Sequence, residues 1–138
     1  MRKSVVAPII VALLLVWANP ASSSVAAGST WYSDGTRYKT VHTGATIKAY
    51  ATGAMLGVPY QLVIAYPHPD PKHATHPCYG PLAQLVNPTI VYAGPNGLIG
   101  SVRGVVTHTV PGVYQLCFLD SSPEKSTATF GATIVIAA

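Results

Sequence analysis

The segment from Pro67 to Pro81 holds the densest group of potential metal ligands in the chain. It contains three of the five histidines (His68, His73 and His76) and one of the four acids, Asp70. Imidazole and carboxylate groups bind Zn²⁺ and Cu²⁺, and the neighbouring prolines would lower the entropy cost of fixing them. The spacing includes no His-x-His or helical His-x-x-x-His pair, however, and Pro-rich segments tend to be extended. We therefore expect an exposed loop without a cofactor, and treat a Zn²⁺ or Cu²⁺ site as the alternative.

The other polar side chains do not form a recognisable catalytic motif. His42 and His108 are isolated in the sequence, which favours surface or hydrogen-bonded histidines over metal ligands. The sequence has no Gly-x-Ser-x-Gly motif, no His-Glu-x-x-His motif and no Gly-rich phosphate loop. Asp120-Ser121-Ser122 places hydroxyls beside a carboxylate, but a turn after a strand is the simpler interpretation. We expect a protein that is not an enzyme.

Cys78 and Cys117 are the two cysteines, and they lie 39 residues apart. In an exported chain, an even pair is most simply a disulfide. Closing a loop of this length would stabilise the fold by about 4 kcal/mol in the chain-entropy model. No Cys-x-x-Cys redox motif is present, so we predict a structural bridge.

The first 27 residues have the order of a secretory signal peptide. Met1-Arg2-Lys3 is basic, an apolar run follows from Ser4 to Ala18, and small residues occupy Ala21 to Ala27. The apolar run is shorter than the roughly 20 residues of a membrane span. We expect cleavage after Ala26 or Ala27, a secreted or envelope-associated product, and no membrane span after cleavage.

Residues 28–138 are expected to form one domain of modest charge. Without Arg2 and Lys3, six basic residues face four acids, and the formal charge falls from +4 to +2. The remaining basic residues are scattered singly along the sequence, without the basic cluster that nucleic-acid modules carry. We expect no nucleic-acid partner.

The mature region predicts strands and no helix. Apolar and polar residues alternate, which is the period of a strand, and 12 prolines and 12 glycines interrupt the whole chain. Four segments give the clearest strand pattern: Ala45–Thr52, Tyr60–Tyr66, Val113–Asp120 and Phe130–Ala137. Weaker patterns cover Thr36–His42, Val86–Tyr92 and Leu98–Val106, and turn signals such as Gly94-Pro95-Asn96-Gly97 divide them.

About seven short strands predict an all-β, immunoglobulin-like antiparallel sandwich of two sheets, with a small closed barrel as the alternative. Tyr60–Tyr66 is apolar on both faces and is therefore expected to be central. The predicted core contains Ile47, Leu62, Ile64, Leu116, Phe118 and Ile134. Cys117 has the opposite parity to Leu116 and Phe118, so it should face away from this core, where the bridge would tie a loop to the outside of the sheet.

Parts of the chain resemble small immunoglobulin-like domains exported by bacteria. The likeness lies in Gly44–Ile64, where Thr52-Gly53, Met55-Leu56 and Gly57 separate two strands, and in the late strand Gly112–Phe118. The first half, with Ser33-Asp34-Gly35-Thr36, is also similar to the apoproteins that carry enediyne antibiotics. The chain departs from these families, because Tyr114 precedes Cys117 by three residues, not two, and one long-range bridge replaces two short-range ones. The resemblance implies a fold and leaves the activity open.

These observations favour a secreted, non-enzymatic interaction module that binds an extracellular protein, a glycan or a small ligand. Its expected contacts are the loop 67–81 and exposed tyrosines (Tyr32, Tyr50, Tyr79 and Tyr92). One alternative is a structural or self-assembling envelope protein, which Ala132–Ala138 would support if it lay on an open sheet edge. The other is a small-ligand or metal carrier that uses the loop 67–81.

Overall fold

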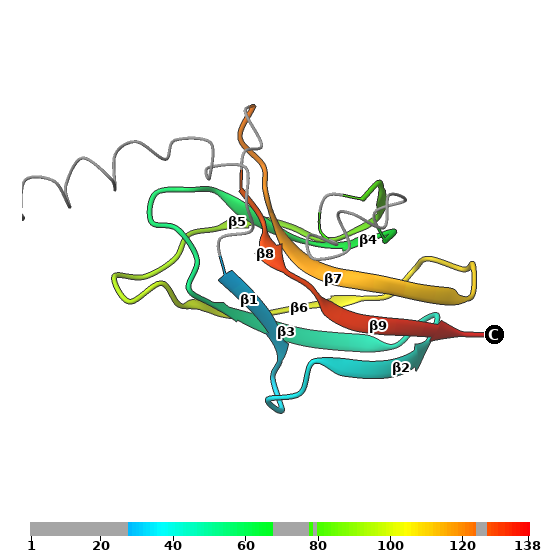
Figure 1. The fold of residues 1–138 in the computed structure, drawn as a ribbon. Coiled ribbons are helices and arrows are strands. Elements are labelled where there is room, and N and C mark those ends of the chain that lie inside the picture. The colour runs from blue at the N-terminus through cyan, green and yellow to red at the C-terminus, as the bar shows by residue number, and fades with distance from the viewer. Residues whose placement is uncertain (1–27, 68–77, 79, 124–126) are drawn as a thin grey trace, which may run out of the picture.

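The computed structural model describes residues 28–67, 78, 80–123 and 127–138, which form nine strands in two packed sheets (Figure 1). The strands are β1 (Gly28–Tyr32), β2 (Tyr38–His42), β3 (Thr46–Thr52), β4 (Tyr60–Ala65), β5 (Leu82–Val91), β6 (Ile99–Val105), β7 (Gly112–Asp120), β8 (Thr129–Phe130) and β9 (Ala132–Ala137). The predicted all-β sandwich is confirmed, and its arrangement is compatible with an immunoglobulin-like fold. Within the described ranges, no helix is long and apolar enough to cross a membrane. The predicted signal peptide lies outside them.

The chain passes from one sheet to the other twice in a similar way, and this produces two parallel strand pairs. One sheet has the order β6-β3-β1-β8 and the other the order β2-β9-β7-β4-β5. Most neighbours are antiparallel, but β1 pairs with β8 and β2 pairs with β9 in parallel. The antiparallel sandwich predicted from the sequence is therefore present, and two parallel strand pairs are added to it. The chain changes sheets between β1 and β2, and again between β8 and β9, so the N-terminal and C-terminal paths run side by side through both layers.

The core between the sheets follows the alternation of the sequence. All six predicted core residues are at most 4% exposed and belong to one cluster (Ile47, Leu62, Ile64, Leu116, Phe118 and Ile134). The strand β4 lies between β7 and β5, as its two apolar faces predicted. Ala132–Ala137 forms β9 between β2 and β7, so both edges of this strand are paired.

The long strand β5 also covers the free edge of β6 in the other sheet. The side-chain amides of Gln84 and Asn87 hydrogen bond to backbone groups within residues 103–108 at 2.8–3.0 Å. Val86 packs so closely over Gly104 that a Cβ atom there would lie 2.4 Å from the Val86 Cγ1 atom. Because unpaired edge groups promote aggregation, β5 protects this side of the sandwich.

Candidate functional site

The histidine-rich segment lies outside the described residues. The candidate ligands His68, Asp70, His73 and His76 all fall within 68–77, so their predicted exposure and metal binding stay predictions. In the part of the chain that the structure describes, no group of three or more His, Cys, Asp or Glu side chains could hold a metal ion.

The predicted disulfide is confirmed. Cys78 and Cys117 are bonded, with a Cα–Cα distance of 6.0 Å. Cys117 lies on the face of β7 opposite Leu116, so the face was predicted correctly. Both cysteines are nevertheless buried, because they form a second, smaller apolar cluster with Val63 and Ala128 on the outer side of the five-stranded sheet. The bridge therefore fills a small core of its own.

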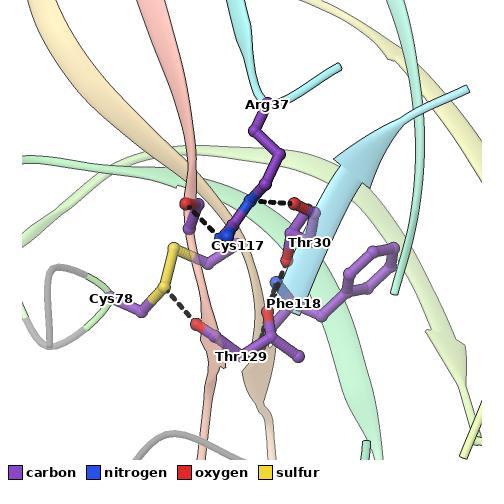
Figure 2. The surroundings of a disulfide bond; sticks show 7 residues. Thr30, Arg37, Cys78, Cys117, Phe118 and Thr129 are labelled. Carbon is purple, nitrogen blue, oxygen red and sulfur yellow. Dashed lines mark hydrogen bonds between the residues drawn. A yellow bond between two sulfur atoms is a disulfide. The ribbon is translucent and has the colours of Figure 1, made fainter. Parts of the chain in front are cut away.

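Polar contacts fix the place beside the bridge where β8 leads into β9 (Figure 2). The Thr129 hydroxyl lies 2.5 Å from the Thr30 hydroxyl and accepts a hydrogen bond from the Phe118 amide at 3.0 Å. The Cys78 sulfur contacts the Thr129 carbonyl oxygen. The Arg37 guanidinium donates to the carbonyl oxygens of Thr30 and Gly131 at 3.2 and 3.0 Å. These contacts satisfy backbone groups that the change of sheet would otherwise leave unpaired.

A small hollow opens on the same outer face, beyond the bridge. It has a volume of about 140 Å³ and lies across β4, β5 and the end of β7, where it is lined by Gln61, Val63, Leu82, Leu85, Leu119, Asp120 and Ser121. Leu82 and Leu85 are 54% and 42% exposed, whereas Asp120 is buried at its end. We call this depression the leucine hollow.

Four rows of paired, described side chains on the outer face of the five-stranded sheet carry no charge. Across β2, β9 and β7 the paired residues are Tyr38, Thr133 and Gln115 in one row and Thr40, Val135 and Val113 in the next. Across β7, β4 and β5 they are Gln115, Ala65 and Leu82, then Cys117, Val63 and Leu85. In these rows of described residues no side chain carries a charge. These rows can meet an apolar partner without desolvating an ion, and Asp120, which lines the hollow, is already buried in the free protein.

The sequence Asp120-Ser121-Ser122 forms a turn, as the simpler interpretation proposed. The Ser121 hydroxyl donates to the Pro59 carbonyl oxygen at 3.1 Å. The Asp120 carboxylate accepts a hydrogen bond from the Ser122 amide at 2.8 Å. These contacts hold the end of β7, and neither uses the groups as a nucleophile and its base.

The two isolated histidines have different surroundings. His42 is exposed at the end of β2, whereas the His108 ring packs edge-on against Tyr66 and Tyr114. The Tyr114 hydroxyl donates to the Val110 carbonyl oxygen at 2.7 Å and lies 3.1 Å from His108 Nε2. Burial, followed by the proximity of Tyr66, raises the pKa of Tyr114. This cluster holds the connection between β6 and β7 in place, so its contacts are structural.

The structure changes the list of tyrosines available for binding. Tyr32 is fully buried, so its predicted exposure was wrong, and its hydroxyl donates to the Thr133 carbonyl oxygen at 2.9 Å. Tyr92 is 60% exposed and Tyr50 is half-buried, while Tyr79 lies outside the described residues. The sequence analysis missed the leucine hollow because irregular pairing in β5 breaks the alternation that would have placed its leucines on one face.

Comparisons of the chain with protein-family models, with curated proteins and with solved structures find no match. The resemblance to exported immunoglobulin-like domains and to enediyne carriers therefore stays a prediction beyond the sandwich fold.

Proposed function

We propose that this chain is an exported, non-enzymatic binding module that contacts a partner protein through the uncharged outer face of the five-stranded sheet. The observation that carries the proposal is the leucine hollow on that face. Its lining residues Leu82 and Leu85 are 54% and 42% exposed, and Tyr38 and Val113 are exposed elsewhere on the same face. Exposed apolar side chains gathered on an uncharged face are typical of protein interaction sites.

The size of the hollow favours a protein partner over a carried small molecule. Pockets that enclose small ligands usually measure about 300–1,000 Å³, whereas the leucine hollow measures about 140 Å³. A depression of this size accommodates one apolar side chain of a partner. The disulfide beside it supports an oxidising, extracellular setting, in agreement with the predicted leader.

The alternatives differ in the support that they retain. Self-assembly through Ala132–Ala138 required an open edge, but β9 is paired on both sides, by β2 and β7. The role of the loop 67–81 in metal or small-ligand carriage stays a prediction, because most of that segment lies outside the described residues. Bacterial origin and residence in the envelope belong to the proposal on the same terms.

The proposal can be tested with a photoreactive residue introduced at position 85 and, as the control, at position 98. Leu98 is a matched control because it is 41% exposed, against 42% for Leu85, and lies in the turn before β6. On intact producing cells, position 85 should give a discrete protein adduct that Leu82→Lys abolishes, and position 98 should give none. Equal adducts from both positions, or none from position 85, would contradict the proposal.

A further inference from the structure

The outer face of the four-stranded sheet, on the opposite side of the molecule, brings two cations together. Lys48 on β3 and Arg103 on β6 are direct cross-strand partners, and both side chains are exposed. Directly opposed residues have Cβ atoms about 5 Å apart, and like charges in such a pair repel each other. Neither cation forms an ion pair with a described residue. The salt bridge found within the described residues joins Lys39 to Asp34. An unfavourable pair of this kind is an attractive position for an anion.

Lys48 also lines an open hollow of about 430 Å³ between β2 and β3, which falls within the usual range of ligand pockets. Its polar lining residues include Ser33, which follows β1, and Thr46 on β3. Asp34 and Lys39 lie there too, but they neutralise each other at 2.6 Å. Hydrogen bonds from Lys39 and then from Thr36 hold the pKa of Asp34 well below its usual range. Lys48 is therefore the uncompensated charge of the hollow.

Aromatic rings continue the same surface along β3. Tyr50 follows Lys48 by two residues and shares its face, and Trp31 on β1 is the direct partner of Tyr50. The Trp31 indole is held by the Arg37 guanidinium, 5.1 Å from the ring centroid, and by a hydrogen bond to Thr52 at 3.3 Å. The space beside Gly100 on β6 is open. The side chains of Tyr50 and Trp31, each half-buried, are therefore neighbours on this surface, and we call them the aromatic ledge.

We propose that this surface binds an acidic polysaccharide, a polymer of uronic acid sugars. The carboxylates bind Lys48 and Arg103 through charge-assisted hydrogen bonds. Sugar hydroxyls bind the polar lining residues of the hollow, and the apolar face of a neighbouring sugar ring packs on the aromatic ledge. A single-stranded nucleic acid would instead need a basic groove that follows a run of phosphates, whereas this surface offers two adjacent cations. The proposal is independent of the protein-binding face described above.

The test measures binding of polygalacturonate to the oxidised protein by calorimetry. Fully methyl-esterified polygalacturonate is the matched ligand control, because it keeps the sugar chain and lacks the negative charges. We expect the acid form to bind about tenfold or more tightly than the ester, with an affinity that falls as salt rises. The double variant Lys48→Gln/Arg103→Gln should lose binding, and Lys48→Arg should retain it.

The folding control is the melting temperature. It should be unchanged or higher in the double variant, because a like-charge repulsion is removed. Absence of polygalacturonate binding, equal binding of the ester, or full retention in the double variant would each overturn the proposal. Tighter binding of oligo(dT) than of polygalacturonate would also overturn it, and would assign the surface to nucleic acid.

Discussion

At the scale of single residues, Tyr32 has the most consequential environment in the core. Its ring is fully buried, its hydroxyl donates to the Thr133 carbonyl oxygen, and the Lys39 ammonium lies 5.5 Å from the ring centroid. Burial, and to a smaller extent the nearby Asp34 carboxylate, raises the pKa of Tyr32 far above its ordinary value. The folded protein therefore keeps this proton at a pH where the unfolded chain releases it.

This difference predicts a loss of stability at alkaline pH. The contribution of Tyr32 should be fully present below pH ~10, the ordinary pKa of tyrosine, and should fall above it by up to about 1.4 kcal/mol per pH unit. The reason is that above this pH the unfolded state binds fewer protons than the folded state. Urea unfolding between about pH 8 and 11 measures the slope.

The variant Tyr32→Phe separates this effect from a general loss of stability. It removes a buried hydrogen bond, which costs about 1 kcal/mol at neutral pH. It should also make the unfolding free energy fall less steeply above pH ~10 than in the wild type. An identical alkaline slope in both proteins would show that Tyr32 does not carry the dependence.

At the scale of secondary-structure elements, the sequence patterns predicted seven of the nine described strands, including β2, β5 and β6 from weaker patterns, and missed β1 and β8. The clear patterns became β3, β4, β7 and β9, because each buries one or both faces in a regular way. The two-residue β8 is too short to show any period, and in β1 the two large residues, Trp31 and Tyr32, are adjacent and do not alternate with polar ones. A strand of this kind is specified by its partners, which are distant in sequence.

The leucine hollow and the Lys48–Arg103 surface could not be predicted from the sequence, because strand register brings together residues that are distant in the chain. Lys48 and Arg103 look isolated there, but the pairing of β3 with β6 makes them neighbours. The prediction of scattered basic residues concerned their order in the sequence, and the fold brings these two together. The cysteine pair was predictable because only two cysteines exist, and parity gave the face of Cys117. Its burial depended on a second small cluster that no local pattern encodes.

Because β5 crosses closely over β6, alanine substitution of the two glycines of β6 should change the free energy of unfolding by different amounts. A Cβ at Gly104 would lie 2.4 Å from the Val86 Cγ1 atom and 2.6 Å from its carbonyl oxygen, whereas nothing lies within 4 Å at Gly100. Gly104→Ala should destabilise the fold by about 1–3 kcal/mol through overpacking. Gly100→Ala, the control, should change the free energy of unfolding by no more than about 0.5 kcal/mol.

Urea unfolding of the Gly104→Ala and Gly100→Ala variants measures this difference in the free energy of unfolding. Equal stabilities would mean that β5 can move away from β6 at no cost, and that it does not seal this edge. A selective loss at Gly104, accompanied by aggregation, would connect the crossing to protection of the β6 edge, since side-chain amides of β5 cover its backbone groups.

At the scale of the whole molecule, the sandwich presents two outer faces of different chemistry. The face of the five-stranded sheet is uncharged in the described rows and carries the leucine hollow. The face of the four-stranded sheet carries Lys48 and Arg103 beside aromatic rings. The core between the sheets separates Lys48 and Arg103 from the leucine hollow, so on our two proposals an acidic polymer would contact these cations while a protein partner occupies the hollow. A module of this kind would connect the two.

The stability of the fold is expected to have two separate sources: the core between the sheets and the disulfide. Neither cysteine belongs to the main cluster between the sheets, so the variant Cys78→Ala/Cys117→Ala should keep the far-UV circular dichroism of a β-sandwich. The bridge joins residues separated by 39 positions. In the chain-entropy model its loss should lower the free energy of unfolding by about 4 kcal/mol. Most of that change would arise in the unfolded state, which becomes less compact.

Urea unfolding can separate this mechanism from ordinary loss of packing, because the m-value reports the surface exposed on unfolding. The cysteine variant should show a higher m-value, since its unfolded chain is no longer cross-linked. Leu116→Ala, within the main cluster, should lose about 2–5 kcal/mol with an unchanged m-value. Loss of the β spectrum in the cysteine variant would contradict this assignment, because it would make the small outer cluster, and not the core between the sheets, the feature on which the fold depends.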